Sequence, residues 1–153
     1  MAAYRFEGYW KDVGTLDSLW DANMDMLSPG SGLNLLDKKW PIYGRTPNCP
    51  PTFVGPDGDI GNSAVAKGCT ILGEVKNTVL SYGSSVGKGA EVSYAIVGEG
   101  CHVGKNAVVG GAPGSVDFDH WGIAVLGPRT TVPDGGVVEP KMMLGGNGKE
   151  VRP

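Results

Sequence analysis

The chain lacks the long apolar stretches and the basic clusters that mark several classes of protein. No apolar run in its 153 residues approaches the ~18 that a membrane-spanning helix needs. No secretory signal peptide opens the sequence, so we expect a cytoplasmic protein without a membrane partner. The formal net charge is −3 and the pI is about 5.3. This balance, with no basic run, argues against nucleic acid or an anionic membrane surface as a partner.

Cysteine and phosphate-binding glycine motifs are also scarce. The three cysteines are odd in number and lack the spacing of metal ligands. We expect Cys69 and Cys101 to be buried packing thiols rather than redox or metal-binding groups. The sequence contains no GxGxxG segment between a strand and a helix and no P-loop. These residues therefore predict no nucleotide site of their own.

Glycine is the residue that the chain has in excess, and it follows a six-residue rhythm. It accounts for 26 of the 153 residues, well above the usual ~7%. Aliphatic residues recur at steps of six in Val65 to Ile71, Val86 to Val92, Val97 to Val103 and Val103 to Val109, and again in Leu126, Val132 and Val138. Small residues precede them by two positions at Ser63, Cys69, Ser84, Ala90, Ala95, Cys101, Ala107, Thr130 and Gly136. Glycine follows directly at Gly61, Gly87, Gly98, Gly104, Gly110 and Gly127.

This rhythm predicts a stacked β-solenoid in which each unit is a short strand and a corner. The aliphatic side chain points into a narrow interior, the small residue also faces inward, and the coils share one core. Glycine at the corners accepts backbone angles that a side chain would penalise. Two steps are irregular, because Ile71 to Val79 spans eight residues and Val92 to Val97 spans five. Residues 110–120 break the period and are predicted to form a loop that leaves one corner.

The chain divides into four segments. Residues 1–28 are predicted to form a strand, a turn and a helix, with Thr15 as the N-cap of the helix. The expected apolar face of that helix consists of Leu16, Leu19, Trp20 and Leu27. Residues 29–59 are predicted as a connector rich in proline, and residues 60–144 as the solenoid. Residues 145–153 are polar, and we expect them to form a frayed tail.

The opening segment carries a more specific signal than the solenoid. Residues 8–15 read GYWKDVGT and lead into the helical pattern. This resembles the GYWxDVGT-to-helix segment of the bacterial glucose-1-phosphate adenylyltransferases, the ADP-glucose pyrophosphorylases. Further segments similar to that family are residues 33–37, 40–43, 50–53, 62–63, 68–71 and 133–135. The resemblance covers roughly residues 4–144. The hexapeptide rhythm alone is shared with many other transferases.

The resemblance implies a fold and a reaction. The fold is mainly β, a left-handed parallel β-helix of hexapeptide repeats preceded by a strand–turn–helix remnant of an α/β nucleotidyltransferase domain. The reaction converts ATP and glucose 1-phosphate into ADP-glucose and pyrophosphate in glycogen biosynthesis. By analogy, Asp12 is the catalytic residue and a ligand of Mg²⁺, which favours one or two protein carboxylates together with phosphate oxygens. Tyr9, Trp10 and Gly14 are the candidate substrate-binding residues. As a structural alternative, Asp12 closes a turn, and Tyr9 and Trp10 pack in the core.

The resemblance also implies that the chain is the C-terminal portion of such an enzyme. The nucleotide site of the family lies in an N-terminal α/β domain whose glycine-rich phosphate loop has no counterpart here. We therefore expect the chain alone to be inactive and to serve oligomerisation and regulation, in a homotetramer or a hetero-oligomer with a related subunit. Trp10, Leu16, Leu19 and Trp20 are expected to lose part of their cover without that domain.

Two other hypotheses follow from the solenoid. Hexapeptide β-helices often serve as trimeric acyltransferases that use a histidine as general base, and His102 and His120 are the only candidates. His102 follows the inward-facing Cys101, so we expect its side chain to point outward. This hypothesis leaves the GYWKDVGT segment unexplained. The third hypothesis is a non-enzymatic scaffold that acts through its flat faces and strand edges.

Overall fold

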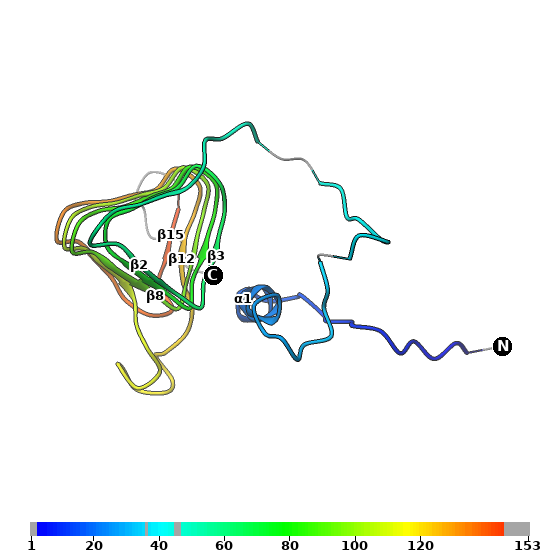
Figure 1. Ribbon diagram of the computed structural model, residues 1–153. Coiled ribbons are helices and arrows are strands. Elements are labelled where there is room, and N and C mark those ends of the chain that lie inside the picture. The colour runs from blue at the N-terminus through cyan, green and yellow to red at the C-terminus, as the bar shows by residue number, and fades with distance from the viewer. Residues whose placement is uncertain (1–2, 36, 45–46, 146–153) are drawn as a thin grey trace.

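The structure is a parallel β-solenoid with one helix beside it. The computed structural model describes residues 3–35, 37–44 and 47–145. Within these residues the chain forms fifteen short strands and one α-helix, α1 (Leu16–Asp25). Figure 1, seen close to the solenoid axis, shows coils of roughly triangular outline with α1 lying outside one face. No helix in the described ranges is long and apolar enough to span a membrane.

The strands form three five-stranded sheets, one for each face of the solenoid. Sheet A contains β1 (Phe53–Val54), β4 (Thr70–Ile71), β7 (Ser85–Val86), β10 (His102–Val103) and β13 (Thr131–Val132). Sheet B contains β2 (Asp59–Gly61), β5 (Glu74–Lys76), β8 (Glu91–Ser93), β11 (Val108–Gly110) and β14 (Val137–Val138). Sheet C contains β3 (Ala64–Val65), β6 (Val79–Leu80), β9 (Ala95–Val97), β12 (Ala124–Leu126) and β15 (Met143–Leu144). Every pairing is parallel and joins successive coils, which confirms the predicted solenoid.

The first coil begins earlier in the chain than residue 60. Strand β1 pairs with β4, with Phe53 opposite Thr70. The first coil therefore starts within the segment 29–59 that the sequence assigns to a connector. The predicted loop is confirmed, and it runs from the end of β11 to the start of β12. The predicted frayed tail, residues 145–153, lies outside the described residues except for its first.

The N-terminal helix is confirmed, whereas the strand expected before it is absent. The Thr15 hydroxyl accepts the Ser18 backbone N–H, and the Ser18 hydroxyl in turn accepts the Thr15 N–H, which closes a capping box. The described residues before Thr15 contain no strand, and no strand of the described chain pairs with them. Helix α1 ends at Asp25, before the proline at position 29.

The core is three columns of aliphatic side chains, one for each sheet. The buried members are Ile71, Val86, Val103 and Val132 of sheet A, Val75, Val92, Val109 and Val138 of sheet B, and Leu80, Val97 and Leu126 of sheet C. The eight-residue step from Ile71 to Val79 is therefore a wrong interpretation. Val75 and Leu80 are the inward residues. The chain from Ile71 to Leu80 therefore forms two short faces of the coil, rather than one face that ends at Val79. Val79 is only half-buried because it points to the outer face.

The small inward positions are filled as the rhythm predicts. Ala90, Ala95 and Ala107 are buried in the core cluster. Two polar residues that share these positions are satisfied by backbone carbonyls, since Ser84 Oγ donates to the Gly98 oxygen at 2.8 Å and Thr130 Oγ1 to the Gly127 oxygen at 2.7 Å. In the described part of the chain, no buried side-chain nitrogen or oxygen lacks a hydrogen-bond partner. The polar residues therefore cost the core little.

Cys69 and Cys101 are packing thiols, as predicted. Both lie in the core cluster, and each thiol donates to a backbone carbonyl of the next coil, Ser81 at 3.2 Å and Gly127 at 3.1 Å. Burial is the main cause that raises the pKa of both thiols. Cys49, in contrast, is half-buried before the first coil, and all three cysteines are free. Solvent and reagents can therefore reach the thiol of Cys49, whereas burial protects the thiols of Cys69 and Cys101.

The corner glycines serve two purposes, and the expected one is confirmed at Gly68, Gly83, Gly89, Gly100 and Gly135, whose φ is positive. Among the glycines that follow an inward aliphatic residue, only Gly110 has a positive φ, of 72°. A Cβ at Gly87 would lie 2.8 Å from the backbone carbon of Gly104, and one at Gly104 would lie 2.5 Å from the backbone nitrogen of Asp134. These glycines therefore allow close contact between coils rather than unusual backbone angles.

Gly87→Ala is expected to destabilise the solenoid by about 1–3 kcal/mol, the usual cost of overpacking a tight contact. The added methyl group would clash with backbone atoms of the next coil, which cannot move aside as a flexible side chain could. Urea unfolding followed by circular dichroism measures the loss. Gly30→Ala is the matched control, because a Cβ there meets no atom within 4 Å. Equal midpoints for the two variants would contradict the packing role.

The thiols are expected to react in two classes. With a disulfide reagent at mildly alkaline pH, Cys49 should react in the native protein. Cys69 and Cys101 should react only after denaturant is added, because burial shields them and raises the pKa of each thiol. The release of the chromophore counts the thiols in each class. Three equally fast thiols in the native chain would show that the coils open readily.

Candidate functional site

The segment that contains the candidate site residues folds back along α1. The Tyr9 hydroxyl donates to Asp25 Oδ2 at 2.9 Å. Lys11 Nζ lies 2.5 Å from Asp21 Oδ2 and 2.7 Å from Asp25 Oδ2. Because these acids lie on the second half of the helix while Thr15 caps its start, the chain before the helix must reverse direction. Three polar contacts therefore fix residues 9–11 on the helix.

The charges in this cluster support one another. Hydrogen bonds from Lys11 and then Tyr9 hold the pKa of the Asp25 carboxyl below its usual range. Desolvation and the bond to Asp25 raise the pKa of Tyr9, so its hydroxyl keeps its proton at neutral pH. A carboxyl with a lowered pKa stabilises the folded state at neutral pH, and this contribution is lost as the pH falls through the lowered value. Tyr9, proposed from the sequence as a substrate contact, is thus held by α1.

The other candidate residues are exposed and make no contact with the acids of the helix. Trp10 is 76% exposed, and Asp12 and Gly14 are also exposed. Asp12 makes no hydrogen bond or ion pair with any described residue, so both of its oxygens are free to act as ligands. Lys11, between Trp10 and Asp12, is bound to the helix. Trp10 and Asp12, on either side of the bound Lys11, are therefore left exposed to solvent.

A metal ion would need more ligands than this chain gathers at Asp12. No group of three or more His, Cys, Asp or Glu side chains that could hold a metal ion occurs in the described parts of the chain. A lone exposed carboxylate does fit Mg²⁺ as one of its ligands, because Mg²⁺ usually combines one or two carboxylates with phosphate oxygens and water. Asp12 thus fits as a contributor to a magnesium site and does not form one alone.

Helix α1 is attached to the solenoid through Trp20. The Trp20 indole Nε1 donates to the Asn77 carbonyl at 2.7 Å, and its ring lies 5.7 Å from that of Tyr94. Met24 is the one buried residue of the helix. The expected loss of cover holds for Trp10, Leu16 and Leu19, which are exposed, but not for Trp20. The solenoid itself covers the Trp20 side.

Tyr94 and Trp121 are the residues that sequence patterns did not reveal. Tyr94 occupies the corner between sheets B and C, where its φ is +51°. The same corner in the two preceding coils is occupied by Asn62 and Asn77, a residue type that tolerates positive φ better than tyrosine does. The Tyr94 ring lies 5.6 Å from that of Trp121, edge to face. Three aromatic rings from distant parts of the sequence, including Trp20, therefore meet at one corner.

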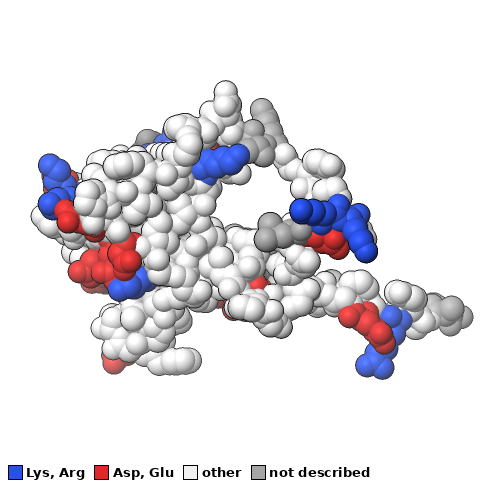
Figure 2. Space-filling view, in the orientation of Figure 1, with Lys and Arg blue, Asp and Glu red and all other residues white. Residues whose placement is uncertain are grey.

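The two histidines lie in different parts of the fold, His102 on sheet A and His120 directly before Trp121 in the loop. His102 is exposed on sheet A, as predicted, and its Nδ1 lies 2.7 Å from the Ser85 hydroxyl on the preceding coil. His120 is exposed in the loop between β11 and β12. On the face of the molecule shown in Figure 2, acidic and basic side chains lie in small separate groups, so no large patch of one charge is visible there. Neither histidine has a carboxylate as a hydrogen-bond partner in the described residues, so no acid orients a base there.

Comparisons with known proteins agree with the fold and the resemblance. Residues 50–112 match the family described as "GlmU-like, C-terminal hexapeptide". Proteins named glucose-1-phosphate adenylyltransferase are similar to most of the chain. The one from Bacillus cytotoxicus is 41% identical over 138 residues, which are 90% of this chain and 34% of the relative. Those from Bacillus mycoides and Bacillus cereus are 39% identical over 141 residues, 92% of this chain and again 34% of the relative.

The resemblance inferred from the GYWKDVGT segment is therefore confirmed as homology. The chain spans about a third of the length of the curated relatives that it matches. Identity of about 40% over nine tenths of the chain is enough to expect the same fold throughout the matched part.

Asp25→Asn is expected to release residues 9–11 from α1, because the amide cannot replace the ion pair with Lys11. Trypsin cleavage after Lys11 should then accelerate about tenfold, since proteolysis follows local opening. Mass spectrometry of the fragments over time measures the rate. Asp57→Asn is the matched control, because it breaks the Lys88 ion pair at the opposite end of the fold. Unchanged cleavage after Lys11 would mean that Asp21 alone holds the segment.

Proposed function

We propose that this chain, a homologue of the glucose-1-phosphate adenylyltransferases, forms the C-terminal part of such an enzyme. In this proposal it supplies Asp12 to the active site and the solenoid to assembly. The reaction transfers the adenylyl group of ATP to the phosphate of glucose 1-phosphate and releases pyrophosphate. The observation that carries the proposal is 39–41% identity over about nine tenths of the chain. Such an enzyme would serve glycogen biosynthesis in the cytoplasm.

The segment before α1 is suited to the role given to it. When bound, Mg²⁺ neutralises charge on the transferring phosphoryl group and on the pyrophosphate. Asp12 offers a carboxylate with no competing partner among the described residues. Trp10 offers an exposed ring face to a sugar, and Gly14 leaves the backbone accessible. Tyr9 and Lys11 bind α1 and so hold the segment in position, while the side chains of Trp10 and Asp12 stay available for ligands.

The chain alone is expected to be inactive in this proposal. About two thirds of the length of the relatives has no counterpart in it, and the sequence carries no phosphate-binding glycine loop. Helix α1 exposes Leu16 and Leu19, at 37% and 39%, which suits contact with a further protein surface. The flat faces of the solenoid suit subunit contacts, and we propose a homotetramer or a hetero-oligomer with a related subunit.

The acyltransferase hypothesis stays an alternative. It rests on His102 or His120 as general base. The hydrogen bond between His102 Nδ1 and the Ser85 hydroxyl joins two coils and lies in no cavity described above. Acyl-CoA consumption by the purified chain separates the two hypotheses. Consumption that disappears in His102→Ala or His120→Ala would favour acyl transfer.

The proposal is tested in a chimera in which this chain replaces the matched third of the Bacillus cereus relative. We expect the chimera to form ADP-glucose from ATP, glucose 1-phosphate and Mg²⁺, with pyrophosphate release as the measurement. Asp12→Asn should lower kcat at least about a hundredfold, because a metal-binding carboxylate is lost.

Asp37→Asn is the control, because Asp37 is an exposed acid of the connector that only closes a turn with Lys39. The isolated chain should form no ADP-glucose. An active chimera with undiminished rate after Asp12→Asn would remove Asp12 from the mechanism. Product from the chain alone would overturn its dependence on a missing domain.

A further inference from the structure

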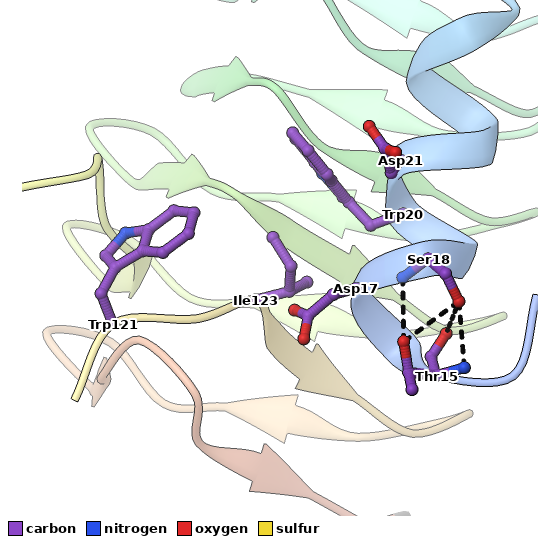
Figure 3. A pocket seen from close by; sticks show the side chains of 7 residues that line it. All are labelled: Thr15, Asp17, Ser18, Trp20, Asp21, Trp121 and Ile123. Atoms are coloured by element: carbon purple, nitrogen blue, oxygen red, sulfur yellow. Dashed lines mark hydrogen bonds between the residues drawn. The ribbon is translucent and has the colours of Figure 1, made fainter. Parts of the chain in front are cut away.

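A cavity of about 450 Å³ lies between α1 and the loop that precedes β12. Figure 3 shows Trp20 and Trp121 on opposite sides of it, with Ile123 between them. The first turns of α1 form a further wall of this open pocket, and the full lining is Thr15, Asp17, Ser18, Trp20, Asp21, Trp121 and Ile123. None of the candidate catalytic residues lines this space.

The walls of the cavity are rigid and aromatic. The Trp20 indole is fixed by its hydrogen bond to the Asn77 carbonyl at 2.7 Å, and the Trp121 indole by its bond to the Gly111 carbonyl at 2.9 Å. Tyr94 lies behind them, with its ring within 6 Å of both. Tyr94 shares its positive φ with Asn62 and Asn77, which occupy the same corner in the preceding coils, so the corner itself sets this backbone angle.

The rim of the cavity is acidic. Figure 3 shows the Asp17 carboxylate directed from α1 towards Ile123. Asp17 makes no ion pair or hydrogen bond with another described residue, whereas Asp21 is neutralised by Lys11 at 2.5 Å. In the first turn, Asp17 also interacts favourably with the helix dipole, which explains its presence but leaves its oxygens without a donor. A phosphate or a carboxylate would be repelled here.

We propose that this cavity binds a guanidinium group, stacked on the indole rings and paired with the Asp17 carboxylate. A guanidinium is planar, stacks on aromatic faces and donates two parallel hydrogen bonds to a carboxylate. The cavity offers both surfaces side by side, and the charge of Asp17 selects a cation. The group can come from a free guanidino compound or from an arginine side chain of a polypeptide. This inference does not depend on the proposed adenylyltransferase function.

The test uses the 153-residue chain and N-acetyl-L-argininamide as the probe. Indole N–H signals in a ¹⁵N correlation spectrum report on each tryptophan separately. The signals of Trp20 and Trp121 should shift with a common saturation curve. The signals of Trp10 and Trp40, which are exposed elsewhere, should not. N-acetyl-L-citrullinamide, which has the same shape without the charge, should bind about tenfold or more weakly.

Asp17→Asn keeps the shape of the rim and should weaken binding of the argininamide about tenfold. Asp57→Asn, remote from the cavity, should leave binding unchanged, and unshifted indole signals in the free variants confirm an intact fold. Free L-arginine distinguishes the two sources. Equal affinity favours a small guanidino compound, and much weaker binding favours a polypeptide arginine, because the free α-carboxylate is repelled. Equal binding of the citrulline probe, no binding of either probe, or full affinity in Asp17→Asn would overturn the proposal.

Discussion

Contact between one coil and the next is the constraint on which the rest of the structure depends. Adjacent strands of a sheet lie about 4.8 Å apart, so each corner must fit within one strand spacing. Gly87 and Gly104 meet this demand by lacking a Cβ where the next backbone passes. The same spacing stacks each aliphatic residue on its equivalent, as Val103 stacks between Val86 and Val132. A single coil has no core of its own, and stability comes from the stack.

The features that recur in every coil because of this spacing could be predicted from the sequence. The inward aliphatic residues, the small inward positions and the loop after β11 all follow from a period that can be read without a structure. The period failed at Val79 because the side that holds Val75 is shorter than six residues, and a counting rule takes the next aliphatic residue that it meets. The second purpose of the glycines was not predicted, because contact between coils is a property of neighbours in space.

In the candidate site, too, the residues of a local motif could be predicted and those brought together only by folding could not. Asp12 was found because a local motif contains it, and the structure leaves its side chain exposed. The aromatic corner could not be found that way, since Trp20, Tyr94 and Trp121 are separated by long stretches of sequence and obey no common spacing. The hydrogen bond from Trp20 to Asn77 joins α1 to the solenoid, so the segment that presents Asp12 and the corner that holds Tyr94 belong to one connected body.

The loop between β11 and β12 leaves the register of the sheets untouched. Strand β12 pairs with β9 as though no residues intervened, with Leu126 opposite Val97. The exposed part of this loop, residues 112–120, can therefore change in length without altering the core, whereas Gly111, Trp121 and Ile123 are held against the solenoid. Homologous solenoids can diversify their surfaces at such a corner while the stack is inherited unchanged. A protein engineer can use the same freedom to insert a foreign peptide at this position.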